Sequence, residues 1–125
     1  MSENTDRYES AVARYLEAWN AGEPDALAKA VAAAWSADGG YTDPLADVRG
    51  HEGIAAVISA AHEQFPGFSF RLAGRVDGHH DMARFGWELV DDADDSAPVA
   101  GFDVITLDDD GRIRTVHGFL DRVPT

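Results

Sequence analysis

The chain has 125 residues, of which 45% are hydrophobic and 26% are charged, and it contains no cysteine. We expect a single domain over residues 1–125, because domains hold roughly 100–200 residues. The lack of cysteine excludes disulfides, zinc–thiolate sites, iron–sulfur clusters and cysteine nucleophiles. The 23 acidic and 10 basic residues give a formal charge of −13, which repels phosphate backbones and anionic lipid. This charge argues against nucleic-acid and membrane partners.

The N-terminal stretch MSENTDRYES is polar and does not resemble a targeting signal. The longest apolar run, Ala30–Trp35, is far shorter than the roughly 20 residues of a membrane helix. A cytoplasmic protein is therefore expected.

Helical periodicity dominates the first half of the chain. Apolar side chains recur at intervals of three or four residues over 8–19, 24–35 and 51–64, which predicts three helices. Each pattern stops at residues typical of helix ends, namely Asn20-Ala21-Gly22, Asp38-Gly39-Gly40 and Pro66-Gly67. Between the second and third helices, Tyr41–Pro44 is expected to be extended and Leu45–Gly50 to be a loop.

From residue 68 onward the apolar period changes from 3.6 to 2, which predicts strands. Four long strands are expected over 68–76, 83–89, 99–107 and 112–122. The turns between them are predicted at Gly78–Asp81, Asp91–Pro98 and Asp110-Gly111. Because helices and strands are segregated rather than alternating, the predicted fold class is α+β. Three N-terminal helices would pack in the concave face of a strongly curved, mainly antiparallel sheet.

Three polar residues lie where apolar neighbours predict burial. Asp103 alternates with apolar residues along its strand, so burial should raise its pKa unless it is paired. Tyr15 lies in the apolar stripe of the first helix, where its hydroxyl needs a partner. Asp43 follows Tyr41 on one face of the short extended segment. These residues are the candidates for a site.

Several segments together resemble one superfamily. Ala13–Gly22 (ARYLEAWNAG), the turn Tyr41-Thr42-Asp43-Pro44 and the glycine-led helix from Gly50 are similar to the nuclear transport factor 2-like superfamily. The closer resemblance is to its SnoaL-like polyketide cyclase and ketosteroid isomerase branch, and the later strands around Asp103 and Gly118–Asp121 fit the same pattern. The resemblance extends from about residue 8 to 121. It implies a cone-shaped α+β barrel whose bent sheet encloses a pocket capped by the helices.

The resemblance also implies catalytic roles for three residues. Ketosteroid isomerases place a tyrosine on the first helix, a base aspartate just before a proline and a second aspartate on a later strand. Tyr15, Asp43 and Asp103 match these positions. Asp43 would then shuttle a proton, while Tyr15 and protonated Asp103 would donate hydrogen bonds to a developing enolate oxygen.

Further residues are expected to line the pocket, because core and pocket wall are one surface in a cone-shaped sheet. In the last strand, Ile113, Thr115, His117, Phe119 and Asp121 are predicted to share the inner face. The residues expected to contact the ligand are Trp19, Tyr41, His62, Phe85, Trp87, His117 and Phe119. For His62 and for His117, the alternative to ligand contact is a hydrogen-bonded histidine in the core.

Each catalytic candidate has a structural interpretation as well. An aspartate before proline is common in turns, and a buried aspartate commonly accepts a hydrogen bond without doing chemistry. The segment between Tyr15 and Asp43 is a few residues longer than the isomerase pattern, which would move Asp43 along the cavity rim. His79-His80-Asp81 lacks further ligands at a metal-binding spacing, so we expect no metal site.

The leading functional hypothesis is cofactor-free acid–base chemistry on a hydrophobic, carbonyl-bearing small molecule. The reaction would be an isomerisation, an aldol-type cyclisation or a dehydration, and epoxide hydrolysis with water activated by Asp103 or Asp121 is a variant. The alternative is a non-catalytic ligand-binding or dimerisation module of the same fold. The resemblance also implies a homodimer formed through the outer face of the sheet.

Overall fold

The computed structural model describes residues 3–124. The elements follow one another as α1 (Glu3–Asn20), α2 (Pro24–Ala34), β1 (Trp35–Thr42), β2 (Asp47–Arg49), α3 (His51–Gln64), β3 (Phe68–His79), β4 (Met82–Asp91), β5 (Val99–Leu107) and β6 (Ile113–Arg122). The strands form one sheet in the order β2-β1-β6-β5-β4-β3. Neighbouring strands are antiparallel except for the parallel pair β1–β6.

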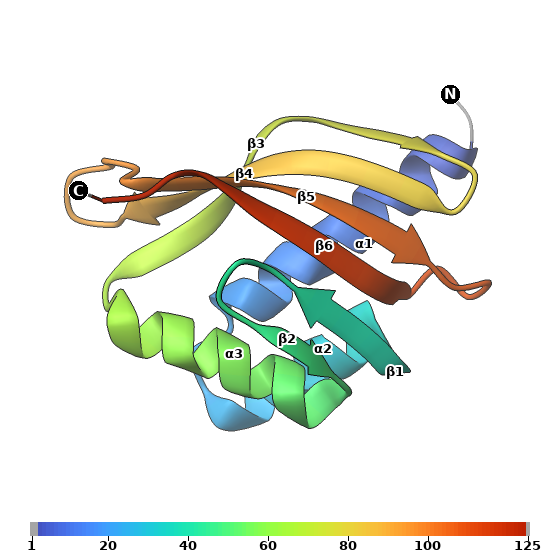
Figure 1. The fold of residues 1–125 in the computed structure, drawn as a ribbon, viewed down its shortest axis with the longest axis horizontal. Coiled ribbons are helices and arrows are strands. Elements are labelled where there is room, and N and C mark those ends of the chain that lie inside the picture. Colours follow the sequence, from blue (N-terminus) through green and yellow to red (C-terminus); the bar gives the residue numbers. More distant parts are fainter. Residues whose placement is uncertain (1–2, 125) are drawn as a thin grey trace.

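The long strands β3 to β6 arch over α1, and α3 lies beside the short strands β1 and β2 (Figure 1). The core fills the space between these helices and the inner face of the sheet. The predicted α+β class, with three helices against a curved and mainly antiparallel sheet, is confirmed.

Strand β5 has the alternation that its sequence predicts. Every second residue from Val99 to Leu107 is buried, and Asp103 is the buried residue in the middle of the strand. On the neighbouring β4, Ala83, Phe85 and Leu89 face the same interior. Burying each large apolar side chain contributes about 1.5–3 kcal/mol, which fixes the register of these two strands.

The second helix ends earlier than predicted, and a strand follows it directly. Trp35 has an extended backbone with φ −110° and ψ 147°, and it begins β1 instead of continuing α2. Pairing of Trp35 with Ile113 of β6 overrides the helical pattern of the preceding alanines. The glycines expected to end the helix lie inside β1, and a Cβ at Gly39 would come within 2.8 Å of the Trp35 ring.

Two other boundaries differ from the predictions. Part of the expected loop Leu45–Gly50 is the strand β2. It pairs with β1, which provides partners for backbone hydrogen-bonding groups of Asp47–Arg49. Strand β3 continues to His79, because Gly78 pairs with Ala83 instead of starting the turn.

The predicted inner face of the last strand is wrong over most of its length. Leu107 pairs with Ile113, but the next residue of β5, Thr106, pairs with Thr115, so β6 carries one extra residue. Such a bulge reverses the in–out alternation of all residues beyond it. His117 and Phe119 therefore lie outside, and Phe119 is 59% exposed.

Candidate active site

A cavity of about 590 Å³ lies between α1, α3 and the inner face of the sheet. Its volume is within the range of roughly 300–1,000 Å³ that is common for small-molecule sites. Most of its wall is apolar or aromatic. Within the part of the chain that the structure describes, the wall holds the polar side chains of Tyr15, Tyr41, Asp43 and Gln64, and of these only Asp43 carries a charge.

Small side chains on α3 create much of this space. Gly53, Ala56, Ala60 and Ala61 all line the cavity from one helix. Ile54 and Ile58, on the adjacent face of the same helix, fill the core. The apolar pattern of the sequence predicts the helix, whereas the run of small residues is the signal that α3 borders a hollow.

Tyr15 and Asp103 form the more buried of two acid–phenol pairs. The Tyr15 hydroxyl donates a hydrogen bond of 2.6 Å to Asp103 Oδ2, and both residues are 2% exposed. Helix α1 supplies the phenol and β5 supplies the carboxyl group. Tyr15 lines the cavity, but Asp103 lies behind it and does not. Direct contact of Asp103 with a ligand stays a prediction, and in this structure Tyr15 stands between Asp103 and the cavity.

Burial governs the proton affinities of this pair. Removal from water raises the pKa of Asp103 from 3.8 to about 6, although the hydrogen bond from Tyr15 opposes the shift. The negative charge of Asp43 adds to the increase. Burial, followed by the charge of Asp103, raises the pKa of Tyr15 well above 10, so the phenol keeps its proton at neutral pH.

Tyr41 and Asp43 form the second pair at the end of β1. The Tyr41 hydroxyl donates a hydrogen bond of 2.6 Å to Asp43 Oδ2. The other carboxylate oxygen, Oδ1, accepts the backbone N–H groups of Leu45 and Ala46 at 2.8 Å each. Asp43 thus stabilises the turn before β2, as an aspartate before proline commonly does, and it also faces the cavity.

Gly118 of β6 lies between the two carboxyl groups. It is the register partner of Asp103. A Cβ at this position would lie 2.8 Å from Asp103 Oδ1 and 3.4 Å from the Cβ of Asp43. Because Gly118 has no side chain, both acidic side chains can face the same interior.

The residues expected to contact a ligand divide into two groups. Trp19, Tyr41 and Trp87 line the cavity. Phe85 does not, because its ring packs behind Tyr15 with the ring centres 5.4 Å apart. His62 is also absent from the wall, and its Nε2 lies 2.7 Å from the carbonyl oxygen of Trp19. His62 is thus a hydrogen-bonded histidine between α3 and α1.

The bulge in β6 removes the last two predicted contacts. His117 faces a smaller, polar hollow on the other side of the sheet, and Phe119 is exposed. Sequence reasoning missed the residues that replace them in the wall, among them Phe65, Phe70, Leu120 and Val123. Phe70 extends the aromatic wall, with its ring centre 5.0 Å from that of Trp19 and 5.5 Å from that of Trp87.

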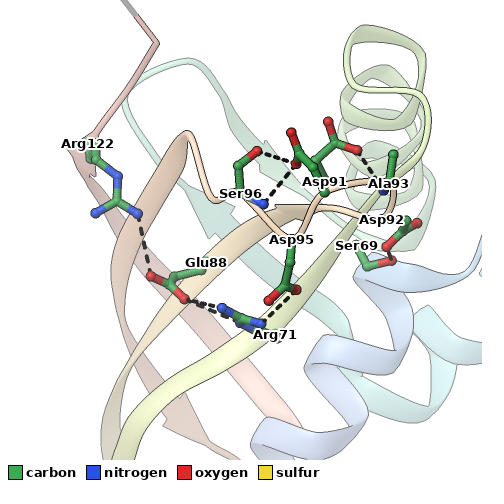
Figure 2. A network of polar contacts seen from close by, with 10 residues as sticks. Ser69, Arg71, Glu88, Asp91, Asp92, Ala93, Asp95, Ser96 and Arg122 are labelled. Carbon is green, nitrogen blue, oxygen red and sulfur yellow. Dashed lines mark hydrogen bonds and ion pairs between the residues drawn. The ribbon is translucent and has the colours of Figure 1, made fainter.

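Charged side chains at the end of β6 contact the neighbouring strands and the loop before β5. Arg122 donates a hydrogen bond of 2.7 Å to the carbonyl oxygen of Ala97. Arg122 also lies 3.5 Å from Glu88, which pairs with Arg71 at 3.1 Å (Figure 2). Val123 follows this strand end, lines the cavity and is half exposed.

Neither a metal-binding cluster nor a membrane-spanning helix is found in residues 3–124. No three His, Asp or Glu side chains in this range are grouped so that they could hold a metal ion. None of the helices in the same range is long and apolar enough to cross a membrane.

Comparison with known proteins gives a consistent family. The SnoaL-like domain family matches residues 12–116. A crystal structure from Agrobacterium tumefaciens str. C58, provisionally assigned as an isomerase of the SnoaL-like family, is 40% identical, with a TM-score of 0.87 over 93% of this chain and 98% of that chain. Comparison with curated proteins gave no match.

Two more distant structures share the fold alone. A provisionally assigned SnoaL-like polyketide cyclase from Jannaschia sp. CCS1 is 18% identical, with a TM-score of 0.76 over 97% of this chain and 90% of that one. A SnoaL-like protein of unknown function from Burkholderia thailandensis E264 is 15% identical, with a TM-score of 0.71 over 96% and 98%.

Proposed function

The chain belongs to the SnoaL-like domain family, and we propose that it is a cofactor-free enzyme for small hydrophobic molecules that moves a proton next to a carbonyl group. The reaction class is isomerisation, cyclisation or dehydration. One observation carries this proposal. Two acid–phenol pairs, Tyr15–Asp103 and Tyr41–Asp43, meet across Gly118 beside a mainly apolar cavity.

In the proposed mechanism Asp43 is the base. It takes a proton from the carbon beside the carbonyl, and the electron pair moves onto the carbonyl oxygen to give an enolate. Tyr15 donates a hydrogen bond to that oxygen. Asp43 then returns the proton to another carbon of the same molecule, so an isomerisation involves no net gain or loss of protons.

Asp103 acts through Tyr15. When Asp103 is ionised, it accepts a hydrogen bond from the Tyr15 hydroxyl, as in the 2.6 Å contact. When Asp103 is protonated, it donates to the Tyr15 oxygen instead, which frees the phenol O–H to turn toward the cavity. The pKa of Asp103 near 6 lets both arrangements occur close to neutral pH.

The wall of the cavity defines the substrate class. Its aromatic rings, from Trp19, Tyr41, Phe70 and Trp87, suit a flat apolar molecule. Lysine, arginine and histidine are absent from the described residues that line the cavity, so none of these residues would form an ion pair with a carboxylate or phosphate on the ligand. We therefore propose an uncharged substrate whose carbonyl end lies at Tyr15.

Binding of substituted 2-naphthols tests the oxygen-binding end of the cavity. Their anions resemble an enolate, and Trp19 and Trp87 in the wall give a fluorescence signal. In Asp43→Asn, which removes the charge that would repel the anion, we expect affinity to increase as the naphthol becomes more acidic, and adding Tyr15→Phe should remove this dependence. The matched control is Tyr8→Phe, because Tyr8 is equally buried but donates to the carbonyl of His80. Equal binding by the two variants would contradict the role of Tyr15.

The second candidate function is ligand binding without turnover. It is favoured by the hydrogen bonds of Asp43, which also explain this residue as part of a turn. A binding module would keep its affinity for neutral ligands in Asp43→Asn and would show no proton exchange in the unmodified protein.

We also propose a homodimer formed through the outer face of the sheet. Phe119 is exposed on that face, and its register partner Phe102 lies beside it on β5. Sedimentation of the wild-type chain and Phe119→Asp tests this assembly. A dimer that the substitution dissociates would support it, whereas a monomeric wild type would contradict it.

A further inference from the structure

We infer that Tyr41 is a positioning residue for Asp43. The Tyr41 hydroxyl fixes the carboxylate so that a single acceptor site, on Oδ2, remains open to accept a proton. The inference rests on the proposed function, because it concerns the same base. Family resemblance assigned Tyr41 no role beyond contact with a ligand. The contacts around Asp43 indicate a more specific one.

The hydrogen bonds of Asp43 leave little freedom to the carboxylate. An ionised carboxylate offers about four acceptor sites, two on each oxygen. The N–H groups of Leu45 and Ala46 occupy both sites of Oδ1. The Tyr41 hydroxyl occupies one site of Oδ2 at 2.6 Å. Three contacts on four sites leave one acceptor site, and it belongs to the oxygen that Tyr41 holds.

Tyr41 is itself held firmly. It is 5% exposed, and its ring packs on Trp19 with the ring centres 5.5 Å apart. In the sheet it lies between Val48 of β2 and Val116 of β6, so its backbone is fixed from both sides. A donor fixed in this way orients its acceptor at little additional entropic cost.

The remaining ionisable groups near the pair cannot replace this donor. Tyr15 approaches from α1 but donates to Asp103, which faces the same interior from β5. The lining residues between positions 3 and 124 include no basic side chain. Burial and the hydrogen bond to Asp43 both raise the pKa of Tyr41, so its hydroxyl keeps the proton that it donates.

Carbon-13 NMR of protein labelled at the aspartate carboxyl carbon tests the inference without a substrate. The Asp43 signal is identified by its absence in Asp43→Asn. In Tyr41→Phe we expect this signal to change its chemical shift and to broaden, because the carboxylate loses the donor that holds Oδ2. Tyr8→Phe, which removes an equally buried hydroxyl elsewhere, should leave the signal unchanged.

A second variant covers the case in which Tyr41→Phe does not fold. Replacing Tyr41 by 3-fluorotyrosine keeps the shape and makes the phenol a stronger donor, so the chemical shift of the Asp43 carboxyl carbon should change without broadening. An unchanged chemical shift in either folded variant overturns the inference.

The two proposals fail in different ways. Exchange of the ketone protons of 2-tetralone reports the base, and the chemical shift of the Asp43 carboxyl carbon reports the positioning. A changed chemical shift without exchange by the wild type would leave the role of Tyr41 intact and contradict the proposed function. Exchange with an unchanged chemical shift would support the proposed function and contradict the role of Tyr41. With both results positive, Tyr41→Phe should lower kcat for exchange more than it changes KM.

Discussion

Asp103 on β5 faces Gly118 on β6, and the Asp103 carboxylate occupies the space that a side chain at Gly118 would fill. A single added carbon at this glycine would lie 2.8 Å from Asp103 Oδ1. It would also contact the Cβ of Asp43 at 3.4 Å. The glycine thus makes it possible for two acidic residues to share one interior.

The first prediction concerns Gly118→Ala. The new methyl group should displace the Asp103 carboxylate and weaken its hydrogen bond to Tyr15. Overpacking of this kind costs roughly 1–3 kcal/mol, which urea unfolding would measure. Gly22→Ala is the control, because a Cβ at Gly22 would meet nothing within 4 Å, and its effect should stay within about 0.5 kcal/mol. Equal stability of the two variants would contradict the tight fit around Asp103.

A second prediction follows from the raised pKa of Asp103. Below pH 3.8 the carboxyl group is protonated in the folded and unfolded chains alike. As the pH rises toward 6, the unfolded chain loses this proton more readily, so the stability present at low pH is lost. A pKa increase from 3.8 to about 6 corresponds to roughly 3 kcal/mol.

The measurement is the free energy of unfolding of the wild type minus that of Asp103→Asn, followed from pH 4 to pH 7.5. Other titrating groups cancel in this difference, and the variant keeps a side-chain oxygen that can accept the Tyr15 hydrogen bond. The difference should fall by a few kcal/mol up to about pH 6.5 and then stay level. A difference that does not vary with pH would show that Asp103 titrates normally.

The third prediction concerns the charge of the ligand. Among residues 3–124, Asp43 is the only one in the cavity wall with a charged side chain, so a carboxylate ligand meets repulsion there and no basic partner. We expect 2-naphthoate to bind at least about tenfold more weakly than neutral 2-acetonaphthone, since close like charges disfavour binding by more than 1.4 kcal/mol. Isothermal titration calorimetry measures both ligands. Asp43→Asn should reduce the difference in affinity between the two ligands. Tighter binding of the naphthoate than of the ketone by the wild type would contradict the proposed substrate class.

Much of this arrangement could be predicted from residue patterns, because local alternation and tertiary packing agree there. Asp103 alternates with apolar residues on β5, and it is buried as expected. Tyr15 lies in the apolar stripe of α1 and has a partner for its hydroxyl, as its burial requires. The short segment around Asp43 brings that residue to the cavity even though β1 is longer than predicted.

The remaining errors arise where long-range pairing decides the structure. The bulge that turns His117 and Phe119 outward depends on how β6 aligns with β5, and the alternation of β6 alone does not reveal it. Trp35 leaves the helix because β6 offers it a strand partner. Phe85 lies in the buried stripe of β4 as predicted, but its ring packs against that of Tyr15 and does not line the cavity.

Proton exchange from 2-tetralone tests the central claim most directly. Proton NMR follows the replacement of the protons next to its carbonyl by solvent deuterium, with the wild type, Asp43→Asn and Tyr15→Phe compared at equal concentration. We expect the wild type to accelerate exchange over buffer. Asp43→Asn should lower this acceleration by about 10²–10⁴-fold, and Tyr15→Phe should lower it as well. Exchange by Asp43→Asn at the wild-type rate, or no acceleration by a wild type that binds the ketone, would contradict the claim that Asp43 is the base of an acid–base enzyme.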